Sequence, residues 1–400
     1  MNKNIEKLFQ LASKSERTIV GLMSGTSLDG LDIVLCKIIG SGRNTKIELL
    51  QFETISYEEN FRQEIKTIFS RRDVDLEKIC LLNSYVALQH AAMVNECLKK
   101  WNCNKNEIDL IASHGQTIYH APKFMHQQEK FSNATFQIGD GDHIAFKTGI
   151  ITISDFRQKH IASGGEGAPL AAYGDYLLFS KLGEDRIMLN IGGISNFTFL
   201  PGNGDAKKII STDVGPGNTL MNAFVQQYFT GIDFDKDATI AKQGKINAEL
   251  LIALKQNSFF EKTFPKTIGP ELFNLNYLKE AQQKSETISI SKEDVMATLN
   301  RFTADCIADA INQINSSNSN FTIYISGGGV HNSLLIENIK SQLPNCNIKS
   351  TNDLFVNADA KEAVLFALLA NECVCGNGIE IGEGLTQIPN VSFGKISFPN

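Results

Sequence analysis

The predicted order of strands and helices occurs twice along this chain, and this duplication constrains the fold more than any other feature. Apolar periodicity and glycine-rich turns predict the first copy as strands 18–23, 32–39 and 46–52, helices 57–69 and 75–99, and strands 108–113 and 150–154. The second copy is predicted as strands 187–191, 197–200 and 209–212, helices 218–229 and 292–315, strand 322–326, helix 332–342, strand 347–349 and helix 360–370. Each copy opens with a hairpin whose turn consists largely of Gly, Ser, Thr and Asn. We therefore expect two facing lobes whose hairpin turns meet in a cleft.

The duplication also predicts the domain boundaries. We expect an N-terminal lobe over residues 15–180, a C-terminal lobe over residues 181–375, and a tail over residues 376–400 that packs back on the lobes. The first 17 residues predict a short amphipathic helix, while residues 247–291 form an insertion of mixed character.

Composition excludes several classes of partner. The formal charge of −6 and the isoelectric point near 5.7 oppose binding to nucleic acid, because proteins that bind its backbone concentrate Lys and Arg. No stretch approaches the roughly 18 uninterrupted apolar residues of a membrane span, and the N-terminus lacks the apolar core of a signal peptide. The eight cysteines have neither the paired spacing of a zinc site nor the density of a disulfide scaffold. We therefore expect a soluble, cytoplasmic protein with reduced thiols and with no nucleic-acid or membrane partner.

The first hairpin turn has the composition of a phosphate-binding loop. Residues 21–32 read GLMSGTSLDGLD. Glycine allows close approach and positive φ, while successive amides and the Ser and Thr hydroxyls can surround phosphate oxygens. A plain tight turn is the competing interpretation. The candidate ATP-binding residues are Gly25, Thr26, Ser27, Leu28, Asp29, Gly30 and Asp32, of which Asp29 and Asp32 can hold a magnesium ion through water.

Two further glycine loops belong to the second copy. Residues 189–196 read LNIGGISN and occupy the corresponding hairpin turn, and residues 324–332 read YISGGGVHN and lead from a buried strand into a helix. Glycine backbone at a strand end lets adenine or ribose lie against it, and a helix start favours anionic groups. The candidate ATP-binding residues here are Gly192, Gly193, Asn196, Gly327, Gly328, Gly329 and Asn332. The chain has no GxxxxGK[ST] motif and no GxGxxG that opens a helix after the first strand, which excludes P-loop and Rossmann enzymes.

Residues 211–218, STDVGPGN, place Asp213 between a strand and a glycine-bounded turn. A carboxylate held there can accept a proton from the nucleophile of a phosphoryl transfer. The alternative is a helix N-cap or an Asx turn, although Asn218 is the better N-cap candidate because the helical pattern begins just after it. We expect Asp213 to be catalytic and Gly215, Gly217 and Asn218 to bind ATP.

Three amide-rich segments of the first copy suit the hydroxyl, carboxylate and acetamido groups of a sugar. They read SHGQT at residues 113–117, SDFR at 154–157 and GGEGAPL at 164–170, and all three are predicted as loops after strands. Arg157 can bind a carboxylate through two hydrogen bonds. The even spacing of His114, His120 and His126 does not predict a metal site, because no acidic cluster accompanies these residues. The candidate sugar-binding residues are His114, Gly115, Gln116, Thr117, Asp155, Arg157, Gly167 and Pro169.

Together these motifs resemble the anhydro-N-acetylmuramic acid kinase family, which recycles bacterial cell wall and belongs to the actin and hexokinase superfamily. The matching segments, in the family's order, are residues 21–32, 113–117, 155–157, 167–170, 190–196, 213–218, 326–332 and 362–363. The resemblance implies an α/β, two-lobed actin/hexokinase-like fold, which is a duplicated ribonuclease H-like fold with an interlobe cleft. It also implies ATP and Mg²⁺ as cofactors and a homodimer.

The resemblance further implies a reaction in which ATP and water act on 1,6-anhydro-N-acetylmuramic acid. The bridge opens and O6 is phosphorylated, which gives N-acetylmuramic acid 6-phosphate. Asp213 matches the family's general base, which activates the water, and Glu362 matches a cleft carboxylate, with an acid on a helix surface as its alternative. Two other functions stay open: a kinase for another sugar on the same fold, and a non-catalytic nucleotide-switched module.

Overall fold

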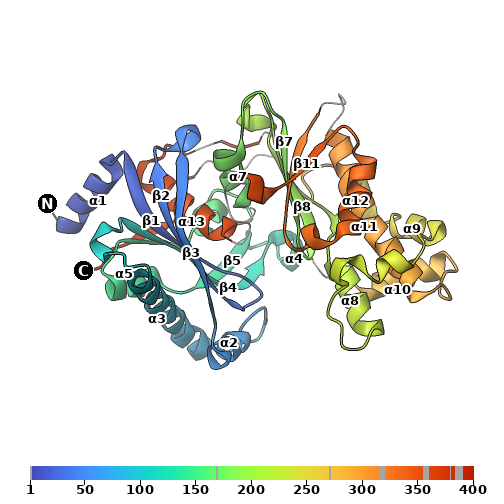
Figure 1. Cartoon of the computed structure of the whole chain (residues 1–400). Helices are drawn as coiled ribbons and strands as arrows, with labels where there is room; N and C mark the ends of the chain where they lie inside the picture. Colours follow the sequence, from blue (N-terminus) through green and yellow to red (C-terminus); the bar gives the residue numbers. More distant parts are fainter. Residues whose placement is uncertain are drawn as a thin grey trace. The chain divides into compact units, whose positions relative to one another are not determined.

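The computed structural model describes residues 2–167, 170–269, 272–314, 320–354, 360–378, 380–382 and 391–400. Two compact units are present: one comprises the described residues of Met1–Leu178, Asp359–Ile381 and Ile388–Asn400, and the other those of Phe179–Ala358 and Gly382–Gln387. Each unit contains one β-sheet with helices packed against it (Figure 1).

The sheet of the first unit has the strand order β12-β6-β4-β1-β2-β3, and β5 pairs with β4. The first three strands form an antiparallel meander, to which β4 and then β6 add in parallel, while β5 and β12 add antiparallel. The strands are β1 (Glu16–Ser24), β2 (Gly30–Ile39), β3 (Lys46–Ser56), β4 (Leu110–Ala121), β5 (Ala134–Ile138), β6 (Thr152–Ser154) and β12 (Lys395–Ser397).

Helices α3 (Leu76–Lys100) and α13 (Lys361–Cys375) pack on opposite faces of this sheet. Successive residues of a strand face opposite sides. Val20 and Leu22 share the core that α3 contributes to, whereas a Cβ atom on Gly21 would lie 2.1 Å from the carbonyl oxygen of Ala363 in α13. This helix belongs to the first unit and not to the C-terminal lobe, where its position in the sequence predicts it. The other helices are α1 (Lys3–Ser13), α2 (Glu59–Lys66), α4 (Lys123–His126), α5 (Gly141–Thr148), α6 (Gln158–Ala162) and α7 (Ala171–Phe179).

The sheet of the second unit repeats this topology in the order β11-β10-β7-β8-β9. Its first three strands again form an antiparallel meander, and two strands again add in parallel on the side of the first strand. The strands are β7 (Arg186–Ile191), β8 (Ile194–Leu200), β9 (Ile210–Pro216), β10 (Thr322–Ser326) and β11 (Asn347–Ser350). The predicted duplication is therefore confirmed, and the chain has the duplicated ribonuclease H-like α/β fold.

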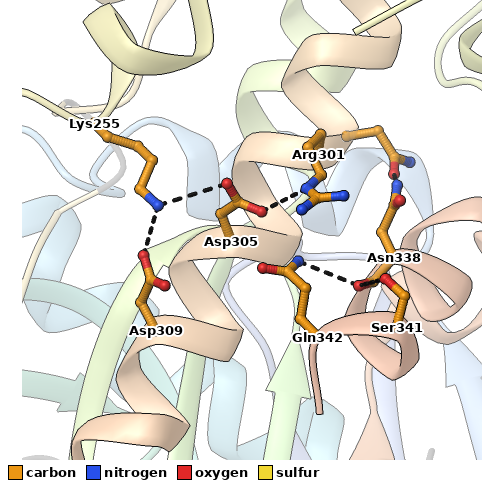
Figure 2. Close-up of polar contacts among 8 residues, drawn as sticks. Lys255, Arg301, Asp305, Asp309, Asn338, Ser341 and Gln342 are labelled. Atoms are coloured by element: carbon orange, nitrogen blue, oxygen red, sulfur yellow. Dashed lines mark hydrogen bonds and ion pairs between the residues drawn. The ribbon is translucent and has the colours of Figure 1, made fainter. Parts of the chain in front are cut away.

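Helix α11 (Lys292–Ile314) is the central helix of the second unit and is buried along most of its length. It packs against β9, α8 (Thr219–Tyr228), α9 (Ala248–Leu254) and α12 (Ser333–Gln342). Charged and amide side chains support this packing (Figure 2). Lys255 Nζ lies 2.7 Å from an Asp309 carboxylate oxygen and 3.5 Å from one of Asp305, and Asp305 also pairs with Arg301 at 2.6 Å. Residues 247–291, which followed no assignable pattern, contribute α9 and α10 (Leu275–Lys284) to this helical layer.

One prediction of local structure is wrong. Residues 113–117 lie inside β4 rather than in a loop, because Gly115 makes a bulge in the strand and does not end it. Strand β5 and helices α5 and α7 were not predicted, although residues 134–138 of β5 alternate apolar and polar side chains; in the structure Phe136 of β5 is exposed while Thr135 is buried. Among the described helices, none has the length and apolar character needed to span a bilayer.

Candidate functional site

The turn between β1 and β2 is tied to β4 by a chain of buried side chains. Ser24 Oγ donates to Gln116 Oε1 and accepts from the Tyr57 hydroxyl at 2.7 Å. His90 Nε2 lies 2.8 Å from the same hydroxyl. Because Tyr57 gives its single proton to Ser24, His90 must carry the hydrogen on Nε2. Gln116 Nε2 then donates to Gly25 O at 3.3 Å, so the chain fixes where the turn begins.

The turn itself combines a buried anchor with exposed polar groups. Leu28 adopts a φ of +57° and packs into the core, so its side chain holds the turn in place. Thr26, Ser27 and Asp29 are exposed, and Ser27 Oγ donates to Asp29 at 2.7 Å. Such a turn presents hydroxyls, amides and a carboxylate to solvent, which is the composition expected of a phosphate-binding loop.

The two carboxylates of this hairpin fit a magnesium ion held through water. Asp29 is exposed, and Asp32 is partly exposed and accepts a hydrogen bond from Thr54 Oγ1 at 2.5 Å. Mg²⁺ usually keeps several waters and binds one or two carboxylates together with substrate phosphates. Within the described part of the chain, no group of three His, Cys, Asp or Glu residues gathers to form an all-protein metal cage.

His114 and Arg157 form the best-defined polar pair of the first unit. Arg157 Nε donates to His114 Nε2 at 2.9 Å, and His114 Nδ1 lies 2.9 Å from Gly115 O. Burial, together with the nearby Arg157 charge, lowers the pKa of His114 well below its ordinary value. His114 is therefore neutral, and Nδ1 carries its proton. Gly115 permits this geometry, because its φ is +73° and a Cβ atom there would lie 2.5 Å from Ile138 O.

Arg157 also fixes the loop that contains Gly167. Its Nη1 donates to Gly167 O at 2.6 Å, and the Gly167 amide donates to His160 Nδ1 at 2.8 Å. Burial lowers the pKa of Arg157 to about 10, while the nearby Glu362 charge opposes this shift. The predicted residue Pro169 lies outside the described residues.

The remaining sugar candidates have protein partners. Asp155, at a φ of +56°, pairs with Lys395 of β12, and Thr117 Oγ1 accepts from Gln137 Nε2 at 3.1 Å. Glu362 lies in the first turn of α13 and is exposed. Although the residue is exposed, the neighbouring protein partly desolvates the Glu362 carboxyl and raises its pKa; the Arg157 charge opposes this rise and the Asp32 charge adds to it. Glu362 is thus electrostatically close to both the sugar candidates and the first hairpin.

In the second unit, the two predicted glycine loops and the glycine-bounded turn that follows Asp213 converge on the end of β7. The amides of Gly217 and Asn218 donate to Gly193 O and Gly192 O at 2.9 and 2.8 Å. A Cβ atom on Gly217 would lie 2.3 Å from Gly192 O, and one on Gly327 would lie 2.7 Å from Ile191 O. These loops need glycine because their backbones are in contact.

A cavity of about 440 Å³ opens beside these loops. Its polar and glycine lining includes Asn218, Gly328 and Asn332, all of which the sequence analysis assigned to ATP binding. Met221 and Phe234 add apolar surface. A concave site with an apolar wall and a few polar groups suits a nucleoside. Asn332 also caps α12 by accepting from the Leu335 amide at 3.0 Å.

Asp213 lies on β9, opposite Asn196 of β8. Its Oδ2 accepts a hydrogen bond from the Ile268 amide at 2.8 Å, and its own amide donates to Lys266 O at 2.9 Å. It is not a helix cap: α8 begins after Asn218, whose side chain donates to Ile191 O. Asp213 is half-buried.

Several residues that support these sites were not predicted from the sequence. His90 and Tyr57 lie within or beside helices that carry ordinary helical patterns, so nothing in the sequence marks the buried contacts of Tyr57 with Ser24 and with His90. The cavity wall formed by residues 234–237 lies in an irregular segment without a motif. The polar residues Asp235 and Asp237 in that segment were the available signal.

The duplicated sheet topology, with glycine loops gathered at a strand end, defines a protein of the actin- and hexokinase-like fold class. A family model described as anhydro-N-acetylmuramic acid kinase matches residues 17–383. The chain belongs to the anhydro-N-acetylmuramic acid kinase family.

Curated relatives match the chain over its length. The anhydro-N-acetylmuramic acid kinase of Pseudoalteromonas atlantica is 55% identical and covers 100% of both chains. That of Caldanaerobacter subterraneus subsp. tengcongensis is 40% identical over 98% of this chain and 100% of its own. Among solved structures, the activator of the 2-hydroxyisocaproyl-CoA dehydratase from Clostridium difficile with bound ADPNP has a TM-score of 0.42 at 12% identity, covering 89% of this chain and 95% of its own.

Proposed function

We propose that this chain is an ATP-dependent kinase that opens 1,6-anhydro-N-acetylmuramic acid with water and phosphorylates O6. The products are N-acetylmuramic acid 6-phosphate and ADP, and the reaction belongs to the recycling of cell-wall peptidoglycan. Membership of the family over nearly the whole chain is the observation that carries this proposal. The convergent glycine loops of the second unit and their cavity support ATP binding.

The reaction balances with Asp213 as the base. The Asp213 carboxylate takes a proton from water while the water oxygen bonds to the anomeric carbon. The bond between that carbon and O6 breaks, O6 bonds to the γ-phosphorus, and ADP leaves. A bridged acetal has no proton on O6, so the base serves the water. Mg²⁺, when bound, neutralises charge on the phosphates, and Asp29 and Asp32 would hold it through water.

The first unit supplies groups suited to the sugar. Arg157 can bind the sugar carboxylate, and its contact with His114 sets the plane of the guanidinium. The loop that contains Gly167 can offer polar groups to the hydroxyl and acetamido groups. Gln116 is fully buried and its amide is bonded to Ser24 and Gly25, so it acts on the first hairpin and not on the sugar. Glu362, whose pKa is raised, can exchange a proton with the substrate at a higher pH than an ordinary glutamate.

Replacement of Asp213 tests the base assignment. Asp213→Asn should lower turnover by roughly 100- to 10,000-fold, the usual contribution of a general base, while ATP affinity changes little. Asp309→Asn, the same charge change on the exposed side of α11, is the control. Full activity in Asp213→Asn would refute the assignment.

Assays with free N-acetylmuramic acid and glucose test the substrate, since preference for either would indicate another sugar kinase.

We further propose that the enzyme acts in the cytoplasm, where ATP is available, and as a homodimer. Light scattering on purified protein should give twice the chain mass of 44.1 kDa. A mass of one chain at micromolar concentration would contradict the homodimer.

A further inference from the structure

Residues 264–268, within the insertion that the sequence left unassigned, contact the strand that carries Asp213. Four contacts join the two segments. The Asp213 amide donates to Lys266 O at 2.9 Å, and the Lys266 amide donates to Thr212 Oγ1 at 2.9 Å. Thr212 Oγ1 also lies 3.2 Å from Lys266 O, and the Ile268 amide donates to Asp213 Oδ2 at 2.8 Å. The insertion therefore bonds both the backbone and the carboxylate of Asp213.

The Lys266 side chain anchors this segment in an aromatic pocket. Lys266 is 6% exposed. Its Nζ lies 4.7 Å from the ring centre of Phe259, 5.2 Å from that of Phe264 and 5.9 Å from that of Phe260. An ammonium group over aromatic faces is attracted by their quadrupoles, most strongly where water is excluded. Nζ also lies 3.5 Å from Phe259 O. Burial lowers the pKa of Lys266, which is the cost of holding a charge there.

The aromatic pocket is itself part of a rigid core. Phe259 and Phe260 pack against Phe273 of the same insertion and, through Phe260 and Phe273, against Phe302 of α11. A lysine fixed to this cluster cannot slide along the strand without losing its contacts with the rings. The backbone of residues 266–268 is thereby held against β9.

We infer that Lys266 is a positioning residue for Asp213: its anchored side chain holds the backbone of residues 266–268 so that the Ile268 amide fixes one carboxylate oxygen. This inference rests on the proposed role of Asp213 as the base. It assigns a function to the insertion, which supplies the hydrogen bond that orients the catalytic carboxylate. Lys266 acts through the backbone and does not itself touch the substrate.

The test compares variants of Lys266 with a matched control. Lys266→Met keeps the apolar stem but removes the charge. We expect kcat to fall at least tenfold, which corresponds to about 1.4 kcal/mol. The KM values for ATP and for the sugar should change by no more than about twofold. The acid limb of the kcat profile should move to higher pH, because a weakened hydrogen bond no longer favours the carboxylate form. Lys266→Arg should restore much of kcat. Lys262→Met, the same change at an exposed position of the insertion outside residues 264–268, should leave kcat and its pH profile unchanged.

A milder variant covers the case in which Lys266→Met does not fold. Phe264→Leu removes one of the three rings, and a smaller shift in the same direction is expected, with the thermal unfolding temperature as a check on folding. Wild-type kcat and pH profile in folded Lys266→Met or Phe264→Leu would overturn the inference. A failure of the proposed function is distinguishable from a failure of this inference: a fully active Asp213→Asn variant would refute the role of Asp213 as the base, whereas the Lys266 and Phe264 variants test only how Asp213 is positioned.

Discussion

Arg157 Nε donates a 2.9 Å hydrogen bond to the unprotonated Nε2 of His114, so the guanidinium is oriented by a neutral histidine. This contact requires the tautomer with its proton on Nδ1, which lies 2.9 Å from Gly115 O. The second nitrogen contact of Arg157, from Nη1 to Gly167 O, uses the same planar fork. One arginine thus joins the β4 bulge to the Gly167 loop.

Arg157→Lys should lower kcat/KM for the sugar by roughly 10- to 100-fold. A lysine ammonium cannot reach His114 and Gly167 in the same plane, and losing a hydrogen bond from a charged donor costs about 1.5–3 kcal/mol. Steady-state kinetics with varied sugar measure the effect. Lys159→Arg, at an exposed position of α6, is the control. An unchanged KM and kcat in Arg157→Lys would show that the sugar does not use this residue.

Gly327→Ala should destabilise the protein, whereas Gly328→Ala should not. At Gly327 the φ is +82° and a new Cβ would lie 2.7 Å from both Asn190 Oδ1 and Ile191 O. At Gly328 the nearest atom would be 3.7 Å away, an ordinary contact. We expect a loss of about 1–3 kcal/mol for the first variant and less than about 0.5 kcal/mol for the second, measured by urea unfolding. Equal losses would mean that the two loops are not in contact through Gly327.

Stability should fall as the pH drops from about 6.5 to about 4. Burial lowers the pKa of both His90 and His160 to about 4, whereas the unfolded chain binds these protons near 6.5. Between these values the unfolded state holds more protons, so acid favours unfolding. As the pH falls across this window, each histidine lowers the free energy of unfolding by roughly 3 kcal/mol.

The variant His90→Gln isolates one of the two histidines. Its amide can still donate to the Tyr57 hydroxyl, but it does not titrate. The slope of unfolding free energy against pH should therefore be shallower in this variant between about 4 and 6.5, as followed by urea unfolding at each pH. A slope identical to that of the wild type would show that His90 is protonated in the folded protein.

Asp305→Asn should cost more stability than Asp309→Asn. The Asp305 carboxylate is buried and pairs with two cations: Arg301, which also lies on α11, and Lys255, at the end of α9 (Figure 2). The Asp309 side chain is 52% exposed and pairs with Lys255 alone among the ion pairs of the described residues. We expect about 1–2 kcal/mol for the first variant and about 0–0.5 kcal/mol for the second from urea unfolding. Equal effects would contradict this assignment of the network.

Local patterns were sufficient to predict most of the fold. The two meanders, their helices and the parallel strands follow from apolar periodicity, and the structure gives both sheets the same strand order. The unit to which α13 belongs was not predictable in this way, because helix packing depends on long-range contacts such as that of Gly21 with Ala363. Residues 113–117 were misread because glycine in a strand can mark either a bulge or an end.

The candidate site was predictable where glycine carried the signal. The loops at Gly192, Gly217 and Gly327 come together at one strand end, as their backbone contacts require. The residues that orient the site were not predictable, since Tyr57, His90 and Lys266 act through contacts made only in the folded chain. Their types and spacing are ordinary for the segments in which they lie.

Identifying the product in ¹⁸O-labelled water tests the central claim most directly. The protein is incubated with ATP, Mg²⁺ and 1,6-anhydro-N-acetylmuramic acid, and the product is analysed by mass spectrometry. The proposed reaction predicts N-acetylmuramic acid 6-phosphate that carries the water oxygen on the anomeric carbon and none in the phosphate group. Label in the phosphate, or ADP formed without a phosphorylated sugar, would contradict it.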